Sequence, residues 1–292
     1  MKAYLDADNQ IRLFRPDCNM ERMNDSMARL HMPSFDSDAY IACIKELLRV
    51  DKSWIPEGEG YSLYIRPTAI STYAYVGVGP TKSAKLYTIL SPVGPYYPSG
   101  FAPIKLLADD KYVRAWPGGT GNTKVGGNYG PTIKPQMEAA EKGYTQVLWL
   151  FGEEHFITEV GTMNLFFVWE KPEGGLELVT PPLDRGDILP GVTRRSVLDL
   201  VREWGGMEVN ERNCTMAEVV SAVEEGRMVE SFGTGTAAVL CPVAEINYNG
   251  AILPLPLKSG GVSGELCQRL WDAMADIHYG RQEHEWSVLV EE

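Results

Sequence analysis

Apolar residues recur at helical spacing in two segments near the start of the chain. In both, they follow the period that places one face of a helix against a core. These positions are Met20, Met23, Met27 and Leu30 in residues 20–31, and Ile41, Ile44, Leu47 and Leu48 further on. Asn19 and Asp36 precede the two segments and can accept hydrogen bonds from first-turn N–H groups. We therefore expect two helices, capped by Asn19 and Asp36.

Short runs rich in β-branched and aromatic residues predict strands. These runs are residues 10–14, 62–68, 85–91, 147–151, 163–169 and 176–179. Helical periods return later in the chain, at residues 192–204, 216–225 and 262–279. The second of these follows Thr215-Met216-Ala217-Glu218, which fits a capping box.

Residues 91–103 interrupt the pattern with four prolines and two glycines, which neither a helix nor a strand tolerates. We expect a connector there. The chain is thereby predicted to be α+β with two domains: a small domain at 1–91, an interdomain loop at 92–103 and a large domain at 104–292.

Composition and charge narrow the classes of partner. The 292 residues are 44% hydrophobic and 23% charged, as in ordinary globular proteins. The net charge of −12 disfavours nucleic acid. The longest apolar stretch, around 237–244, is far short of the roughly 20 residues of a membrane span, so we expect no membrane partner.

The cysteines and histidines carry no familiar site pattern. Five cysteines stand at wide spacing without a CxxC pair, and the four histidines form no zinc motif. We expect no metal and an intracellular, reducing compartment, with the cytoplasm favoured and the mitochondrion as the alternative.

Residues 118–130 place six glycines around a single lysine, Lys124. A phosphate-binding P-loop would need Gly before and Ser or Thr after the lysine, whereas Thr123 and Val125 flank it. A dinucleotide fingerprint fails as well, because Lys124 stands where its third glycine belongs. A lysine on a backbone that can approach a planar ligand suits Schiff-base chemistry. The alternative is a mobile surface loop whose lysine is only solvated.

Glu159 lies beside an apolar strand, where a carboxylate needs a partner. That partner is either the ring nitrogen of a pyridoxal phosphate or an arginine in an ion pair. Two segments could bind the phosphate of such a cofactor. Residues 189–194 open a helix with free N–H groups, and residues 233–237 offer hydroxyls and backbone N–H groups. Either segment could also be no more than a cap or a turn.

Taken together, these segments resemble the branched-chain amino acid aminotransferases, pyridoxal phosphate enzymes of fold type IV. The resemblance runs from end to end. It is carried by LFRP at 13–16, NMERM at 19–23, SLYIRP at 62–67, SPVGPY at 91–96, KVGGNY at 124–129, TEVGTMN at 158–164, LPGVTR at 189–194 and GTGTA at 233–237.

The resemblance implies a small N-terminal α/β domain and a larger, mixed β-barrel-like domain with helices, similar to D-amino acid aminotransferase. It implies pyridoxal 5′-phosphate as cofactor, amino acids and 2-oxo acids as substrates, and a homodimer. The implied reaction moves the amino group of leucine, isoleucine or valine to 2-oxoglutarate by ping-pong Schiff-base chemistry. Lys124 is then the catalytic residue that binds the cofactor and shuttles the proton.

The same resemblance assigns the remaining site residues. Those implied to bind the cofactor are Arg22, Arg114, Tyr129, Glu159 at the ring nitrogen, Val192, Thr193 and Thr236. Those implied to bind the substrate are Tyr64, Arg66, Tyr96 and Ala237, with Val78 approaching from the neighbouring subunit.

Three departures from the family pattern leave alternatives open. Position 238 is Ala where some animal relatives have the first cysteine of a redox CxxC, and residues 184–187 carry extra charge. The family also has a segment ahead of Lys2, so we expect an N-terminally short chain of lower activity. The alternatives are a D-amino acid transaminase, an aminodeoxychorismate lyase, or an inactive homologue that serves as a partner subunit.

Overall fold

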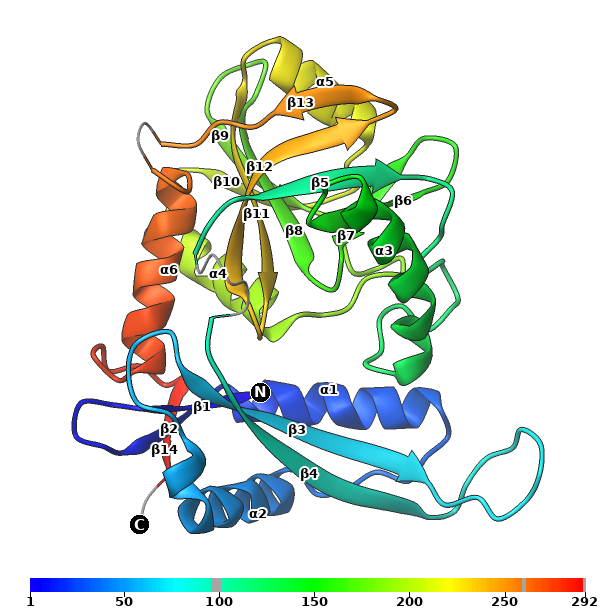
Figure 1. Cartoon of the computed structure of the whole chain (residues 1–292), viewed down its shortest axis with the longest axis vertical. Helices are drawn as coiled ribbons and strands as arrows, with labels where there is room; N and C mark the ends of the chain where they lie inside the picture. The colour runs from blue at the N-terminus through cyan, green and yellow to red at the C-terminus, as the bar shows by residue number, and fades with distance from the viewer. Residues whose placement is uncertain (96–100, 259–260, 291–292) are drawn as a thin grey trace. The chain divides into compact units, whose positions relative to one another are not determined.

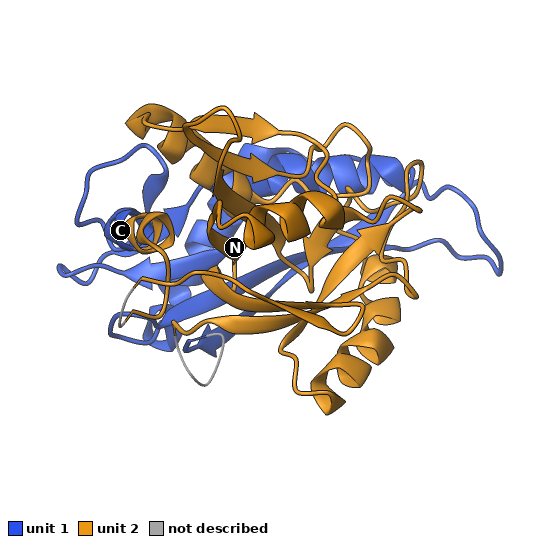
Figure 2. Ribbon diagram, turned by 90° about the horizontal axis from the view of Figure 1, so that it is seen from above, with its two compact units in different colours: residues 1–98, 272–292 blue, residues 99–271 orange. Residues whose placement is uncertain are grey.

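The computed structural model describes residues 1–95, 101–258 and 261–290, and the chain separates into two compact units (Figure 2). Unit 1 comprises residues 1–98 and 272–292, and unit 2 comprises residues 99–271. The expected division differs at its end, because residues 272–292 belong with the N-terminal residues. Strand β14 (Ser287–Val290) pairs with β2 (Ile11–Phe14), which draws the end of the chain into unit 1. Of the expected connector, residues 96–100 lie outside the described residues.

Unit 1 is an antiparallel sheet with two helices, in the strand order β14-β2-β1-β3-β4 (Figure 1). Its other strands are β1 (Lys2–Leu5), β3 (Ser62–Ser71) and β4 (Ala84–Val93), and its helices are α1 (Pro16–Arg29), α2 (Ser37–Val50) and the 3-10 turn η1 (Lys52–Trp54). Apolar residues of the helices and of the sheet meet in one core, which includes Met20, Ile44, Leu48, Leu63 and Ile65.

The two expected helix caps in unit 1 have different outcomes. Asp36 accepts the Ala39 N–H at 2.9 Å, which confirms it as the cap of α2. The Asn19 prediction is wrong, because α1 begins at Pro16 and Arg15 is its N-cap. Proline presets the first-turn backbone angle, and the Arg15 N–H pairs with the distant Trp286 carbonyl at 2.9 Å. The start of α1 therefore depends on a residue far away in the sequence.

Unit 2 is a mixed sheet with the strand order β10-β9-β8-β11-β12-β5-β6-β7, to which β13 adds by pairing with β12. The strands are β5 (Ile104–Asp109), β6 (Gln146–Phe151), β7 (Phe156–Val160), β8 (Asn164–Glu170), β9 (Leu176–Thr180), β10 (Glu208–Glu211), β11 (Met228–Gly235), β12 (Val239–Tyr248) and β13 (Ala251–Pro254). A tight turn, in which Val160 and Met163 exchange backbone hydrogen bonds, joins β7 at one end of this order to β8 within it. The sheet thus curls, which confirms the expected α+β fold with a barrel-like large domain.

Three of the four helices of unit 2 that the structure describes lie close to predicted positions, whereas α3 (Ile133–Glu141) was not predicted. The three are α4 (Val192–Trp204), α5 (Met216–Glu224) and α6 (Glu265–His278), which continues into unit 1, besides the 3-10 turns η2 (Gly126–Asn128) and η3 (Gly130–Thr132). Thr215 and Glu218 form the expected capping box of α5. The six predicted strands are present as β2, β3, β4, β6, β8 and β9, with shifted ends.

Candidate active site

Glu159 is a buried carboxylate near the end of β7, with its side chain 1% exposed. Its Oε1 accepts the Leu189 N–H at 2.7 Å, and its Oε2 pairs with Arg114 Nη2 at 3.1 Å. The arginine ion pair, one of the two alternatives for this residue, is therefore present. A carboxylate has more acceptor sites than these two contacts use, so a further donor can still bind it.

Burial raises the pKa of Glu159, because desolvation disfavours the charged form. Arg114, the Leu189 hydrogen bond and Lys124 act in the opposite direction and lower this pKa. The influence of Lys124 shows that its ammonium group lies within electrostatic reach of the buried carboxylate. The two principal predicted residues, both in unit 2, are thus coupled through charge.

Lys124 lies in a loop that Asn128 fixes from inside. Asn128 Nδ2 donates to the carbonyls of Thr120 and Thr123 at 2.7 and 2.9 Å, and its Oδ1 accepts from Thr120 Oγ1 at 2.8 Å. These bonds hold the backbone just before Lys124, whose side chain is exposed. Lys124 Nζ lies 4.6 Å from the centre of the Tyr129 ring, so these two predicted cofactor residues are neighbours.

Gly121 in the same loop packs against two other segments of the site. A Cβ at this position would lie 2.5 Å from Ala115 Cβ and 2.6 Å from the Asp187 carbonyl oxygen. Ala115 follows Arg114, and Asp187 precedes Leu189 by two residues. Because no Cβ fits there, glycine allows the lysine loop to meet both partners of Glu159.

The start of helix α4 provides N–H groups that can bind an anion. Gly191 is its N-cap, and in the described part of the chain no side chain caps the helix. Asn164 Nδ2 donates to the Leu189 carbonyl at 2.9 Å, while its Oδ1 fills the space that a Cβ at Gly191 would need. The helix N-terminus attracts negative charge. The predicted phosphate residues Val192 and Thr193 form its first turn and are buried.

Residues 233–237 span the end of strand β11 and the turn that follows it. Gly233 lies against the β7–β8 turn, where a Cβ would be 3.1 Å from atoms of Met163 and Val160. Thr234 Oγ1 is buried and has no hydrogen-bond partner among the described residues. Thr236 and Ala237 follow in the turn and are half-buried. The turn therefore offers hydroxyl groups beside the strand that carries Glu159.

These features fit the pyridoxal phosphate that the resemblance implies. A buried carboxylate suits a ring nitrogen, and a lysine that acts on it through charge suits an aldehyde carbon. A helix start without a side-chain cap suits a phosphate. The residues of unit 2 that would hold the group are Lys124, Tyr129, Glu159, Val192, Thr193 and Thr236. Arg114 is buried and contacts Glu159.

The other predicted residues lie in unit 1 or outside the described part. Arg22 is on α1, and Tyr64 and Arg66 share one face of β3, with the Arg66 guanidinium 5.6 Å from the Tyr64 ring centre. Val78 is fully exposed in the loop between β3 and β4. Tyr96 lies outside the described residues.

Sequence reasoning missed three residues that organise the site. Asn128 fixes the lysine loop, Asn164 holds the turn before α4, and Asp187 contacts Arg114 through its backbone. Each lies inside or beside a segment that the sequence singled out. Their roles depend on partners that only the fold brings close, so spacing alone gave no signal.

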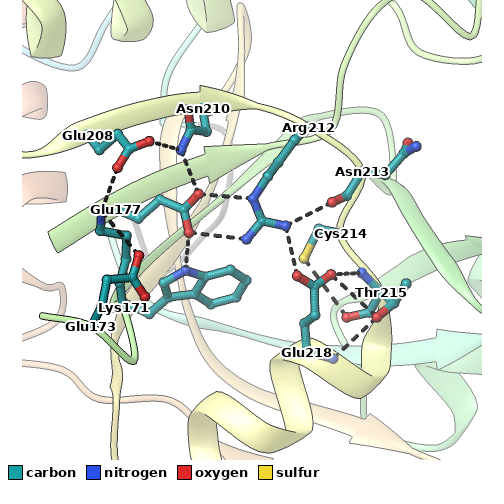
Figure 3. A network of polar contacts seen from close by, with 11 residues as sticks. Lys171, Glu173, Glu177, Glu208, Asn210, Arg212, Asn213, Cys214, Thr215 and Glu218 are labelled. Carbon is teal, nitrogen blue, oxygen red and sulfur yellow. Dashed lines mark hydrogen bonds and ion pairs between the residues drawn. The ribbon is translucent and has the colours of Figure 1, made fainter. Parts of the chain in front are cut away.

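A second cluster of arginine and carboxylates lies around β9, β10 and the start of α5 (Figure 3). Glu177 accepts from Arg212 Nε at 2.9 Å, Arg212 Nη2 at 3.1 Å, Asn210 Nδ2 at 2.8 Å and Trp169 Nε1 at 2.6 Å. Arg212 also donates to Glu218 at 2.8 Å. These donors hold the pKa of Glu177 at about 2 against its burial.

Two kinds of feature are absent from the described residues. No helix there is long and apolar enough to cross a membrane. No group of three or more His, Cys, Asp or Glu side chains is arranged there to hold a metal ion.

Comparison with known proteins gives a consistent result. The family described as Amino-transferase class IV matches residues 1–246. A branched-chain-amino-acid aminotransferase of Monosiga brevicollis is 54% identical over 290 residues, covering 99% of this chain and 74% of the relative. Two Mus musculus enzymes of that name, one cytosolic and one mitochondrial, are 50% and 51% identical, each covering 99% of this chain and 74% and 73% of the relative.

Solved structures agree with the sequence relatives. The T.th. branched-chain amino acid aminotransferase with pyridoxamine 5′-phosphate superposes with a TM-score of 0.80 at 26% identity, covering 99% of this chain and 88% of that one. The same enzyme complexed with N-(5′-phosphopyridoxyl)-L-glutamate gives 0.78 at 26% identity, covering 99% and 87%.

Proposed function

The chain belongs to the class IV amino-transferase family, and from this premise we propose the reaction that it catalyses. It transfers the amino group of L-leucine, L-isoleucine or L-valine to 2-oxoglutarate, with pyridoxal 5′-phosphate as cofactor. The observation that carries the proposal is the arrangement in unit 2. There Glu159 joins Arg114 and the turn before α4, within electrostatic reach of Lys124.

When bound, pyridoxal phosphate supplies an aldehyde that condenses with amines and a ring that takes up an electron pair. Lys124 Nζ would hold the cofactor at its aldehyde carbon and, once the substrate amine has taken its place there, the free amine would move the proton from the substrate Cα to the cofactor C4′. Glu159 holds a proton at the ring nitrogen, and Arg114 and the Leu189 N–H fix the carboxylate that does so. Tyr129 donates to the phenolic oxygen from its place beside Lys124.

We assign the phosphate of the cofactor to the first turn of α4 and to the turn after β11. The N–H groups of Val192 and Thr193 and the hydroxyl of Thr236 bind it, since a helix N-terminus favours anions. Burial of Val192 and Thr193 strengthens these interactions by excluding water.

The remaining site residues lie in unit 1 and in the turn after β11, and their roles are assigned from the resemblance alone. The resemblance assigns Arg22 to the phosphate, and Tyr64 and the Thr236–Ala237 N–H groups to the α-carboxylate. Arg66 pairs with the distal carboxylate of glutamate, because a buried carboxylate without a partner is costly.

A homodimer is part of the proposal. The exposed apolar side chains of Tyr75, Val76 and Val78 support it, because such patches mark contact surfaces. Light scattering at micromolar concentration tests it, and a monomer under assay conditions would contradict it.

We also propose that the protein works in an intracellular, reducing compartment. It is supported by the absence of disulfides among the described cysteines and by relatives that are cytosolic or mitochondrial. Fractionation of cells that express the tagged protein distinguishes the cytosol from the mitochondrion.

The reaction is tested by incubating the purified protein with pyridoxal phosphate, 2-oxoglutarate and single amino acids. We expect glutamate from L-leucine, L-isoleucine and L-valine, and none from D-leucine or D-alanine. Glutamate from the D-amino acids, or none from any amino acid, would contradict the proposal.

A further inference from the structure

The segment 184–187 carries two aspartates with opposite environments. Asp184 is exposed, whereas Asp187 is completely buried. Asp187 Oδ2 pairs with Arg185 Nη2 at 2.7 Å, while its Oδ1 is buried without a hydrogen-bond partner in the described part of the chain. Burying a carboxylate is costly, and an unsatisfied oxygen adds to the cost. Asp187 is thus a buried carboxyl group that one arginine satisfies only in part.

The backbone beside Asp187 holds both members of the Arg114–Glu159 pair. The Asp187 carbonyl accepts from Arg114 Nη1 at 3.3 Å. Two residues on, the Leu189 N–H donates to Glu159 Oε1 at 2.7 Å. The Arg114–Glu159 contact at 3.1 Å closes a ring of interactions that runs through the segment 187–189. A shift of Asp187 therefore disturbs both charges of the pair.

Arg185 ties this segment to the hairpin that bears Glu159. Its guanidinium lies 5.2 Å from the Phe151 ring centre and 4.9 Å from that of Phe156. These two rings are register partners at the end of β6 and the start of β7. Arg185 Nη1 also reaches Asn213 Oδ1 at 3.3 Å. The Arg185–Asp187 pair thus connects the start of β7 with the ring of contacts near its end.

The charge of Asp187 also acts on Glu159 directly. It raises the pKa of Glu159, whereas Arg114 and Lys124 lower it, and burial remains the largest cause of the shift. A nearby negative charge favours the protonated form of a neighbouring acid. Asp187 is therefore coupled to Glu159 through both contacts and charge.

We propose that Asp187, held by Arg185, is a positioning residue for transamination that keeps the Arg114–Glu159 pair in its working arrangement. The inference rests on the proposed function, in which Glu159 acts at the ring nitrogen of the cofactor. The effect of Asp187 passes through Arg114, Leu189 and the field at Glu159.

The test compares Asp187→Asn with Asp184→Asn, a matched change three residues away on the exposed side of the same segment. We expect Asp187→Asn to lower kcat about tenfold and to change the KM for leucine by less than about twofold. This pattern is typical of a group whose charge stabilises the transition state more than the bound substrate. The pH midpoint of the cofactor's visible absorption should move to lower pH, because cationic groups near Glu159 lose a negative neighbour. Asp184→Asn should change neither quantity.

Arg185 variants separate positioning from a general loss of structure. Arg185→Gln should lower kcat as Asp187→Asn does, and Arg185→Lys should restore most of it, because lysine can still pair with Asp187. If Asp187→Asn does not fold, judged by circular dichroism, the two Arg185 variants decide. Equal kcat and equal absorption midpoints for Asp187→Asn and Asp184→Asn overturn the inference, as do equal values for Arg185→Gln and wild type. Inactive wild-type protein would reject the proposed function instead, and the absorption midpoints would still test the role of Asp187.

Discussion

Two of the arginine–glutamate pairs in unit 2, Arg212–Glu177 and Arg114–Glu159, have similar contact distances and differ in chemistry. Glu177 at β9 accepts four hydrogen bonds, and its pKa lies at about 2. Glu159 at β7 has two partners, and burial raises its pKa. The Arg212 side chain is 37% exposed and that of Arg114 is 2% exposed. Glu177, whose acceptor sites are all used, anchors neighbouring strands. Glu159 is buried with spare acceptor sites, so it can bind a further donor.

The largest expected effect comes from removing the amine of Lys124, since arginine keeps the positive charge but can neither bind an aldehyde carbon nor carry the proton. Lys124→Arg should lower transamination by at least about 10³-fold, because the proton carrier at the substrate Cα is lost. Borohydride reduction of the wild-type protein followed by peptide mapping should place the cofactor on Lys124. Lys134→Arg on α3 is the matched control and should remain active. A reduced cofactor on Lys134 or Lys142 would contradict the assignment.

Replacing each glutamate by glutamine compares the two pairs directly. Glu159→Gln should lower kcat by about two orders of magnitude or more, as the loss of a preorganised charge does elsewhere. Glu177→Gln should leave kcat within about twofold but lower the free energy of unfolding by about 1–3 kcal/mol, since hydrogen bonds to a charged group are lost. Steady-state kinetics and urea unfolding of both variants measure this. A normal kcat for Glu159→Gln would make that residue structural.

The pH dependence of stability should have opposite signs at the two pairs. The pKa of Glu177 is lowered from 4.5 to about 2, so its stabilisation is complete above pH 4.5 and is lost as the pH falls towards 2. The raised pKa of Glu159 has the reverse effect, and its charge costs stability as the pH rises through that pKa. Urea unfolding of the cofactor-free protein at several pH values, with both glutamine variants, measures each contribution. The destabilisation by Glu177→Gln should shrink in acid, and an effect independent of pH down to 2 would be inconsistent with this assignment.

The smallest expected effect is that of oxidation. Cys241 and Cys267 are buried, and burial raises the pKa of the Cys267 thiol well above its usual value, which disfavours the reactive thiolate. Position 238 is Ala, so the partner of a CxxC pair is missing. Mild peroxide followed by a reductant should leave activity within about twofold of its starting value. A reversible loss that maps to Cys241 would show a pairing that these arguments do not include.

The sequence predicts those helices and caps whose signals lie within a few neighbouring residues. The period of α4, the cap at Asp36 and the box at Thr215 are all contained within a few neighbouring residues, and the structure has each of them. The start of α1 was missed because Arg15 pairs with Trp286. Strand β14 was missed for the same reason, since its partner β2 lies at the opposite end of the chain.

The site shows the same limit. Lys124 and Glu159 lie in segments of unusual composition, so the sequence could single them out. The partner of Glu159 could not be chosen, because Arg114 stands 45 residues earlier and only the curled sheet brings the two together. Asn128 and Asp187 act through backbone groups of other segments, and residue spacing does not encode such contacts.

The tight packing at Gly121 affects how substitutions in this protein should be interpreted. In a survey of random variants, almost any replacement at Gly121 would abolish activity, although the residue contributes no functional group. A shorter side chain at Ala115 would not rescue it, because the second obstacle is the Asp187 backbone oxygen, which every residue type possesses. A map of mutational tolerance would therefore mark Gly121 as strongly as Lys124. Adding small amines to the assay distinguishes the two positions. An amine can replace the missing proton carrier of a Lys124 variant, but it cannot relieve the steric clash of a side chain at Gly121.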